Sequence, residues 1–303
     1  MAAERMEDYD DLESQQCTRT LNSHQEKEFS KPKSKLAVGI YLTRNIENSL
    51  TSIPILLCCF CSGLIDSSVF NAWGVFATMQ TGRSPKLLSL RFLEGSKFNT
   101  LAGNTVILGL GASQQPFSHD HAWLQALVAI MFFFFGSFFC SRATGFLSPL
   151  KRHTLASSFF LQTVLIVTAA ALIQGGVVPG IVEDGAEPFM TLVPLPMLSF
   201  QAGMQSVTAR QLGLNEIPTT VLTSVYCDLG NDEKLFVGLK DNWKRNRRIA
   251  AAVLLILGAI IGGWLSRTKG GMSSGLWMAA GVKVCITVSW FAWPAERASE
   301  LPK

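Results

Sequence analysis

Long runs almost free of charged residues constrain this chain more than any other feature. Six of them have about the 17 to 25 residues that a membrane-spanning helix needs, and they lie near residues 50–70, 123–140, 155–173, 189–207, 249–265 and 275–293. Charged residues make up only 16% of the chain and hydrophobic residues 48%, whereas soluble domains average about 25% charged residues. The sequence therefore predicts an all-α membrane protein, a polytopic helical bundle.

Two further apolar runs are short and broken by glycine, threonine or charge. One starts near residue 72 and resumes at 105–111, and the other covers 217–229. If both crossed the membrane, the basic loop at 141–154 would lie outside, against the positive-inside tendency. If each instead enters and leaves on one side, that loop, the basic stretch 234–248 and both termini are cytoplasmic. We therefore predict about six spanning helices and two re-entrant or half-helices, with Arg267 and Lys269 on the unfavourable side.

Outside the membrane domain, predicted at 49–293, two polar segments remain. Residues 1–48 are acidic first and basic later, with few aromatics, which predicts a disordered cytoplasmic tail. Residues 294–303 would form a short cytoplasmic tail. Nothing in the sequence indicates which membrane holds the protein.

Several functional classes find no support in the composition. The net charge is only +4 and no basic stripe carries interleaved aromatics, so we expect no nucleic-acid partner. Cys58, Cys59 and Cys61 lie close together, but no pair among the seven cysteines has zinc-ligand spacing with histidines nearby. We interpret them as small packing residues and predict no metal or cofactor. The chain shows no nucleophile–base set, so we do not expect an enzyme.

Two stretches resemble each other and predict an internal repeat. Residues 62–67, Ser-Gly-Leu-Ile-Asp-Ser, correspond to 202–206, Ala-Gly-Met-Gln-Ser. Further on, 76–82, Phe-Ala-Thr-Met-Gln-Thr-Gly, correspond to 218–224, Pro-Thr-Thr-Val-Leu-Thr-Ser. Each copy would have one spanning helix, a broken segment and two more spanning helices, so the two copies would be inverted repeats. Broken segments at matching positions of such repeats point to a site near the midplane, although chance similarity between Gly- and Thr-rich segments is the alternative.

Residues 83–103 interrupt the first broken segment with charges and a proline. Without them the chain would read Met-Gln-Thr-Gly-Asn-Thr-Val-Ile-Leu-Gly-Leu-Gly, a continuous membrane segment. We predict that 83–103 is a translated intron or other insertion. The alternative is a genuine loop on the outer face.

The joined segment resembles the YoaK-like family of uncharacterised integral-membrane proteins from bacteria and fungi. That family shows Gly-x-x-Asp, then a Phe-rich run into Thr-Gly-Asn-Thr-Val, and in its second half Gly-x-Gln followed by Thr-Thr-x-x-Thr-Gly. The matching residues here are Gly63 with Asp66, Thr81 and Gly82 with Asn104, Thr105 and Val106, Gly203 with Gln205, and Thr219 and Thr220 with Thr223. Ser224 stands where the family more often has glycine. The basic run before residue 249 and the long tail resemble the fungal branch. The resemblance implies a multi-pass membrane protein and brings no substrate.

Polar residues in these motifs are the candidates for a binding site. A carboxylate in hydrocarbon is costly, so Asp66 could bind a cation, relay a proton or cap the broken segment through backbone N–H groups; a plain hydrogen bond to a partner helix is the structural alternative. The candidate substrate-binding residues are Gly63, Asp66, Thr81, Gly82, Asn104, Thr105, Gly203, Gln205, Thr219, Thr220 and Thr223.

These features predict a secondary transporter or permease for a small polar or ionic solute, with the lipid bilayer as its surroundings. The alternative is a non-transporting scaffold or partner-binding subunit, whose buried polar groups only fix helix packing. The oligomeric state is not indicated by the sequence.

Overall fold

A computed structural model of the chain describes residues 50–80, 103–113, 122–148, 150–179 and 188–293. The predicted tails, Thr81, Gly82 and nearly all of the predicted insertion lie outside the described residues. The regular elements within these ranges are all helices. In chain order they are α3 (Ser52–Trp73), α4 (Asn104–Ala112), α5 (Ala122–Leu147), α6 (Arg152–Gln174), η2 (Pro188–Leu192), α7 (Pro194–Gln211), α8 (Thr223–Gly230), α9 (Trp243–Leu265) and α10 (Gly271–Ala292).

Five helices of the described residues are long and apolar enough to cross a membrane: α3, α5, α6, α9 and α10. The sixth expected span corresponds to α7, which begins at Pro194 rather than near residue 189 and is not among the five. Its composition explains the difference, because Gln201, Gln205 and Arg210 lower its hydropathy. Both glutamines are buried, so α7 carries its polar residues into the bundle. The all-helical, multi-pass membrane architecture is confirmed.

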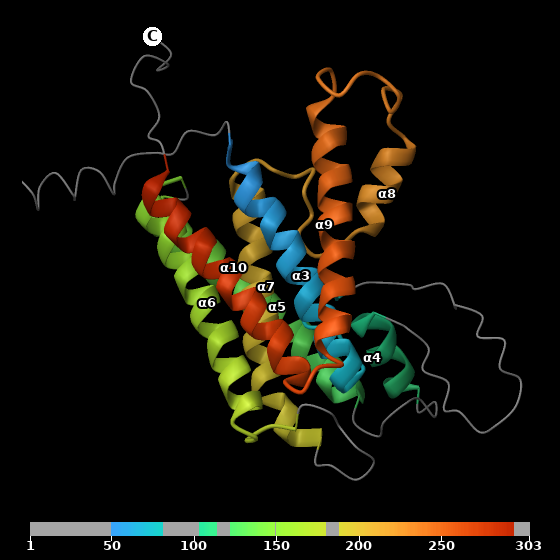
Figure 1. The fold of residues 1–303 in the computed structure, drawn as a ribbon, viewed down its shortest axis with the longest axis vertical. Helices are drawn as coiled ribbons and strands as arrows, with labels where there is room; N and C mark the ends of the chain where they lie inside the picture. The colour runs from blue at the N-terminus through green and yellow to red at the C-terminus, as the bar shows by residue number, and fades with distance from the viewer. Residues whose placement is uncertain (1–49, 81–102, 114–121, 149, 180–187, 294–303) are drawn as a thin grey trace, which may run out of the picture. The chain divides into compact units, whose positions relative to one another are not determined.

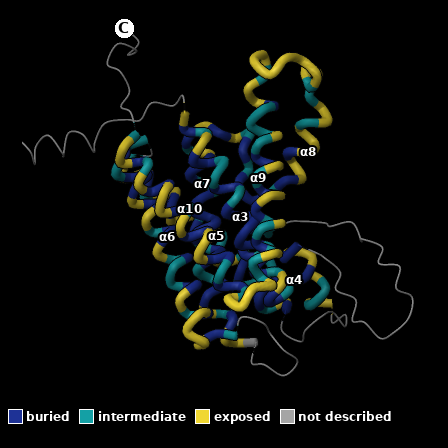
Figure 2. The backbone as a smooth tube through the Cα atoms, in the orientation of Figure 1, coloured by how far each residue is buried: buried dark blue, intermediate teal, exposed yellow. Residues whose placement is uncertain are grey.

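The outer helices present apolar side chains to their surroundings. Only 28% of the apolar window of α5 and of α9 is buried inside the bundle, against 67% for α3. The exposed face of α5 includes Phe132, Phe134, Phe135, Phe138 and Phe139. Helices with such faces are stable where lipid, not water, surrounds them. Figure 2 shows the contrast between the buried α3 and the partly exposed outer helices.

The two halves of the bundle run in opposite directions. In Figure 1, α3 descends, α5 ascends and α6 descends, whereas α7 ascends, α9 descends and α10 ascends. The pairing is crossed, because α3 packs mainly on α9 and α7 mainly on α5, while α6 packs on α10. Each half therefore supplies the helix on which the other half's first helix rests, as expected for inverted repeats.

Four glycines make these crossed contacts possible. A Cβ atom on Gly63 would collide with the backbone of Leu255, and one on Gly203 with the backbone of Phe133. The reciprocal glycines are Gly258, which faces the backbone of Phe60, and Gly136, which faces that of Phe200. Gly203 follows Gly63 by 140 residues, as Phe200 follows Phe60, and Gly258 follows Gly136 by 122 residues, as Leu255 follows Phe133. Each glycine and the backbone that it contacts therefore recur at equivalent positions, so the repeat extends to individual contacts. Small residues of this kind let helices pack closely in membranes.

Candidate functional site

The first broken segment, residues 74–80, is held by the carboxylate of Asp66. α3 ends at Trp73, and the φ of 72° at the following Gly74 turns the chain back toward the helix. Asp66 Oδ1 then accepts hydrogen bonds from the backbone amides of Ala77 (3.0 Å) and Thr78 (2.7 Å), and Oδ2 accepts one from Thr78 Oγ1 (2.6 Å). Of the three roles weighed for Asp66, this geometry matches the cap of the broken segment. Charge-assisted bonds of this type offset part of the cost of burying a carboxylate.

Asn104 closes the same segment from the other side of the predicted insertion. Its Oδ1 accepts from the amide of Phe76 (3.0 Å), and its Nδ2 donates to Phe76 O (2.7 Å) and to Gln80 Oε1 (2.8 Å). The amide and the hydroxyl of Thr105 both donate to Gln80 O, at 3.2 and 2.9 Å. The chain thus leaves at Gln80 and returns in direct contact with it.

The second broken segment, residues 212–222, follows α7 as the first follows α3, but fewer side-chain hydrogen bonds hold it. Ser206 stands at the position of Asp66, and its Oγ lies 3.4 Å from Thr220 Oγ1. Thr219 is 1% exposed, and its hydroxyl has no hydrogen-bond partner among the described residues. A hollow of about 230 Å³ opens beside it. Thr223, at the start of α8, is exposed, whereas Thr219 and Thr220 are buried.

A lysine that the sequence analysis did not single out lies at the centre of the bundle. Lys283 on α10 is 0% exposed, and its Nζ donates to Gln162 Oε1 on α6 and Gln205 Oε1 on α7, both at 2.6 Å. The ammonium also lies 5.1 Å from the ring centroid of Phe159. Lys283 is the only charged residue of α10, and that isolation in an apolar run was the signal that could have identified it.

Gln205 links this lysine to α3. Its Nε2 donates to Ser62 Oγ at 3.0 Å, while its Oε1 accepts from Lys283. One turn earlier on α7, Gln201 is buried with both side-chain amide atoms unpartnered among the described residues. The polar centre is therefore Ser62, Gln162, Gln205 and Lys283, with Gln201 four residues before Gln205 on the same face of α7. Of the predicted site residues, only Gln205 belongs to it; Gly63 and Gly203 are helix-packing positions, and Asp66, Asn104 and Thr105 bind the broken segment.

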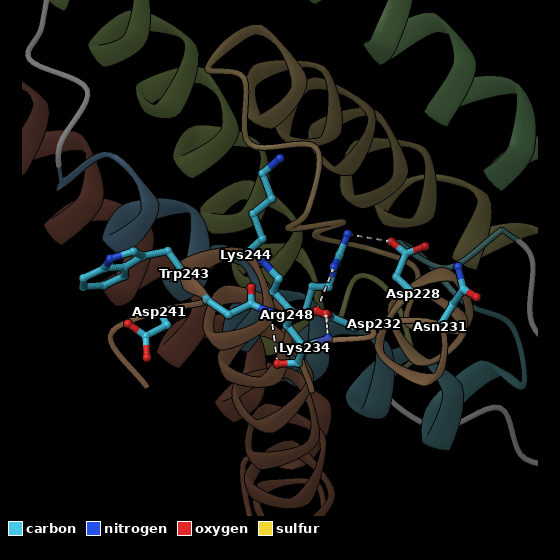
Figure 3. A pocket seen from close by; sticks show the side chains of 9 residues that line it. Asp228, Asn231, Asp232, Lys234, Asp241, Trp243, Lys244 and Arg248 are labelled. Atoms are coloured by element: carbon cyan, nitrogen blue, oxygen red, sulfur yellow. Dashed lines mark hydrogen bonds and ion pairs between the residues drawn. The ribbon is translucent and has the colours of Figure 1, made fainter. Parts of the chain in front are cut away.

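A larger hollow of about 530 Å³ lies outside the bundle, between α8 and α9 (Figure 3). Arg248 lies between two carboxylates there, 3.4 Å from Asp228 and 3.8 Å from Asp232. The side-chain amide of Asn242 donates to Asp232 at 2.9 Å, and this bond, with the Lys234 amide and the charge of Arg248, lowers the pKa of Asp232 below its ordinary value. These side chains bond to one another, so we interpret them as groups that stabilise the α8–α9 connection and not as a binding site.

Metal chemistry gains no support from the described residues, which contain no group of three His, Cys, Asp or Glu side chains that could hold a metal ion. Six cysteines are described, all free, and Cys58, Cys59, Cys61 and Cys140 are buried among helices. This burial agrees with their interpretation as packing residues.

Comparison with known proteins gives one match. A family model described as "Protein of unknown function (DUF1275)" matches residues 55–89 and 88–289, which covers most of the membrane domain. The two matched stretches meet inside the predicted insertion. No curated protein and no solved structure matches the chain.

Proposed function

The chain belongs to the DUF1275 family of proteins of unknown function, and we propose that it is a permease for a small polar or ionic solute. The solute would pass through the polar centre formed around Lys283. This assignment goes beyond the family match, which agrees with the YoaK-like resemblance and carries no activity. We also retain the fungal branch as a proposal, supported by the basic run before α9.

The observation that carries the proposal is the uncompensated charge of Lys283. Its recorded contacts are two amide oxygens, a thiol and an aromatic ring, and no carboxylate lies within salt-bridge distance among the described residues. A buried charge without a counter-charge costs stability, and charges inside membranes usually serve an ion or substrate pathway. If this position served packing alone, an apolar side chain would make the folded protein more stable.

The architecture supports the same function. Inverted halves with a broken segment in each are typical of secondary transporters, whose sites lie between the halves. Here the polar centre takes residues from both halves: Ser62 and Gln162 from the first, Gln205 and Lys283 from the second. Relative movement of the halves would therefore change the polar centre directly.

We further propose that both chain termini are cytoplasmic. The end of the bundle at which α3 begins and α10 ends also holds the α5–α6 turn and the α8–α9 connection. The described basic residues there include Lys151, Lys234, Lys240, Lys244, Arg247 and Arg248. The turn between α9 and α10 at the other end carries only Arg267 and Lys269 among its described residues. This distribution follows the positive-inside tendency.

Solute flux tests the permease. The full chain is reconstituted in liposomes, and vesicle swelling is followed in gradients of a panel of small salts and neutral polar solutes. We expect at least one solute to enter faster than into protein-free vesicles, and Lys283→Gln to reduce that flux by about tenfold or more. Lys269→Gln removes the same charge from the exposed α9–α10 turn and should leave the flux unchanged.

Two outcomes would count against the permease. In one, no member of the panel enters faster than into protein-free vesicles; in the other, Lys283→Gln retains full flux. Either result, obtained with protein that is folded by circular dichroism, would favour the scaffold alternative. Co-purification of a stoichiometric partner protein from native membranes would then identify what the scaffold holds.

A further inference from the structure

The two broken segments lie at matching places in the two halves, but only the first contains a carboxylate bound to its backbone. In the first half, Asp66 fills a cradle formed by two backbone amides and one hydroxyl, from Ala77 and Thr78. In the second half the equivalent residues are Thr219 and Thr220, and Ser206 replaces Asp66. The carboxylate is therefore missing from the second cradle.

Hydrogen bonds fix this equivalence independently of the sequence similarity. Thr105 N donates to Gln80 O in the first half, and Tyr226 N donates to Leu222 O at 3.0 Å in the second. Leu222 follows Gln80 by 142 residues, which is also the separation between Thr78 and Thr220. The side chains of Asp66 and Ser206 in turn contact those two threonines. The two segments thus match before, within and after the cradle.

Two further replacements open the second cradle. In the first half, Phe70 and Phe76 stack with ring centroids 4.7 Å apart beside the Asp66 cradle. Their counterparts in the second half are Arg210 and Pro218. The aromatic stack is therefore absent, and Ser206, Arg210, Pro218 and Thr219 line the hollow instead. Its volume of about 230 Å³ is below the roughly 300–1,000 Å³ of pockets for drug-sized ligands, so its occupant is small.

Two hydrogen-bond donors at this hollow have no acceptor among the described residues. The Thr219 hydroxyl is buried without a hydrogen-bond partner among the described residues. Arg210 is exposed at the rim, and no described carboxylate lies within salt-bridge distance of it. The nearby Glu216 is engaged by Arg247 at 2.6 Å. A buried unpaired hydroxyl beside a free guanidinium is complementary to an anion with planar oxygens.

We propose that the hollow beside α7 and α8 binds the carboxylate of a small organic acid, in the place that Asp66 occupies in the first half. Thr219 and the backbone of the broken segment hold the oxygens, and Arg210 supplies the charge. Ser206, which borders the hollow, follows Gln205 of the polar centre in the chain. The hollow is thus a carboxylate subsite at one end of the bundle.

Acetate is the probe for this subsite. Binding to the full chain in detergent is measured by titration calorimetry and by thermal unfolding in sodium acetate against sodium chloride of equal ionic strength. We expect acetate to bind and to raise the unfolding temperature. Arg210→Gln should weaken binding by about tenfold or more, because it removes a charged hydrogen-bonding group. Thr219→Val should weaken it by a smaller factor, and Thr168→Val on the outer face of α6 should not change it.

Ser206→Asp is the sharpest variant, because it supplies the missing carboxylate within the chain. It should raise the unfolding temperature and abolish the response to acetate. If wild-type protein does not distinguish acetate from chloride, or if Arg210→Gln and Thr219→Val both bind acetate as wild type does, the subsite is refuted. Binding of phosphate or nitrate in preference to acetate would equally overturn the assignment to a carboxylate.

This measurement is separate from the flux experiment. Acetate should still bind to Lys283→Gln, because Lys283 contacts Gln205 and not the residues that line the hollow. Loss of flux with retained acetate binding would support both proposals. Absence of flux in every variant, with acetate binding intact, would refute the permease and leave the carboxylate subsite standing.

Discussion

The two broken segments follow the first helix of each half but satisfy their polar groups differently. The first, 74–80, has Asp66 and Asn104 bound to its amides and carbonyls and two stacked phenylalanines beside it. The second, 212–222, has Ser206, an unpartnered Thr219 and a hollow. An inverted repeat can therefore use one copy as a closed support and leave the other open.

The largest expected loss of stability concerns the glycine contacts that the two halves have in common. Gly63→Leu and Gly203→Leu each place a side chain against a neighbouring backbone, so both should destabilise the fold severely, by about 3 kcal/mol or more. Gly281→Leu is the control, since nothing lies within 4 Å of a Cβ at that exposed position. Thermal unfolding in detergent measures all three. A mild effect at Gly203 alone would show that the two crossed contacts are not equivalent.

The next expected loss of stability differs between the two halves. Asp66→Ala removes a carboxylate that accepts three hydrogen bonds and leaves buried donors unsatisfied, which should cost about 3 kcal/mol of unfolding free energy. Ser206→Ala removes only one weak contact at 3.4 Å and should cost less than about 1 kcal/mol. The difference is measured in one detergent at one pH. Equal losses would contradict the division into a closed and an open copy.

Deleting residues 83–103 sharpens the comparison of the two connecting helices. The deletion joins Gly82 to Asn104, so the bond from Thr105 N to Gln80 O becomes an ordinary helical bond, as it is between Tyr226 and Leu222. Because the deletion shortens the stretch of chain that must be closed between Gln80 and Asn104, the shortened chain should be more stable by about 1–3 kcal/mol. Thermal unfolding tests this gain, and sequencing the dominant transcript tests the origin of the segment. A shortened chain that fails to fold would indicate a genuine loop.

How far the sequence could lead is seen in individual residues. Asp66, Asn104 and the glycine pair Gly63 and Gly203 were recognisable because polar and small residues stand out in apolar helices. The role of the glycines was not, since a packing glycine and a site glycine read alike in sequence. The isolation of Lys283 in an apolar run was a usable signal, but its bonds to Gln162 and Gln205 depend on how α6 and α7 pack, which the sequence does not show.

The same limit applies to the number of spans and to the open cradle. α7 falls short of a span by composition because its polar residues lower its hydropathy. The burial of its two glutamines inside the bundle is not visible in the sequence. Arg210 was not predicted as a binding residue, because a basic residue in the last turn of a helix is common. Its significance depends on the absence of a partner at close range, and that is a property of the folded chain.

The smallest expected effect lies outside the two broken segments, in the α8–α9 connection that belongs to the second half alone. The Asn242 side chain, the Lys234 amide and Arg248 lower the pKa of Asp232. Its contacts therefore stabilise the connection above its unfolded pKa of about 3.9, and this stabilisation is lost as the pH falls through the lower folded value. Hydrogen exchange in 230–245 should be faster in Asp232→Asn than in wild type at pH 6. The two should converge at the acid end; a difference that persists there would contradict this.

The central claim is that both halves carry one carboxylate cradle, filled in the first and empty in the second. The most direct measurement is the acetate-induced rise in unfolding temperature in wild type, Ser206→Asp, and the exchanged variant Asp66→Ser with Ser206→Asp. The account predicts a rise in wild type and none in Ser206→Asp or in the exchanged variant, because Phe70 and Phe76 close the emptied first cradle and Phe70 stands where the second half has Arg210. The same rise in all three, or in none, would contradict it.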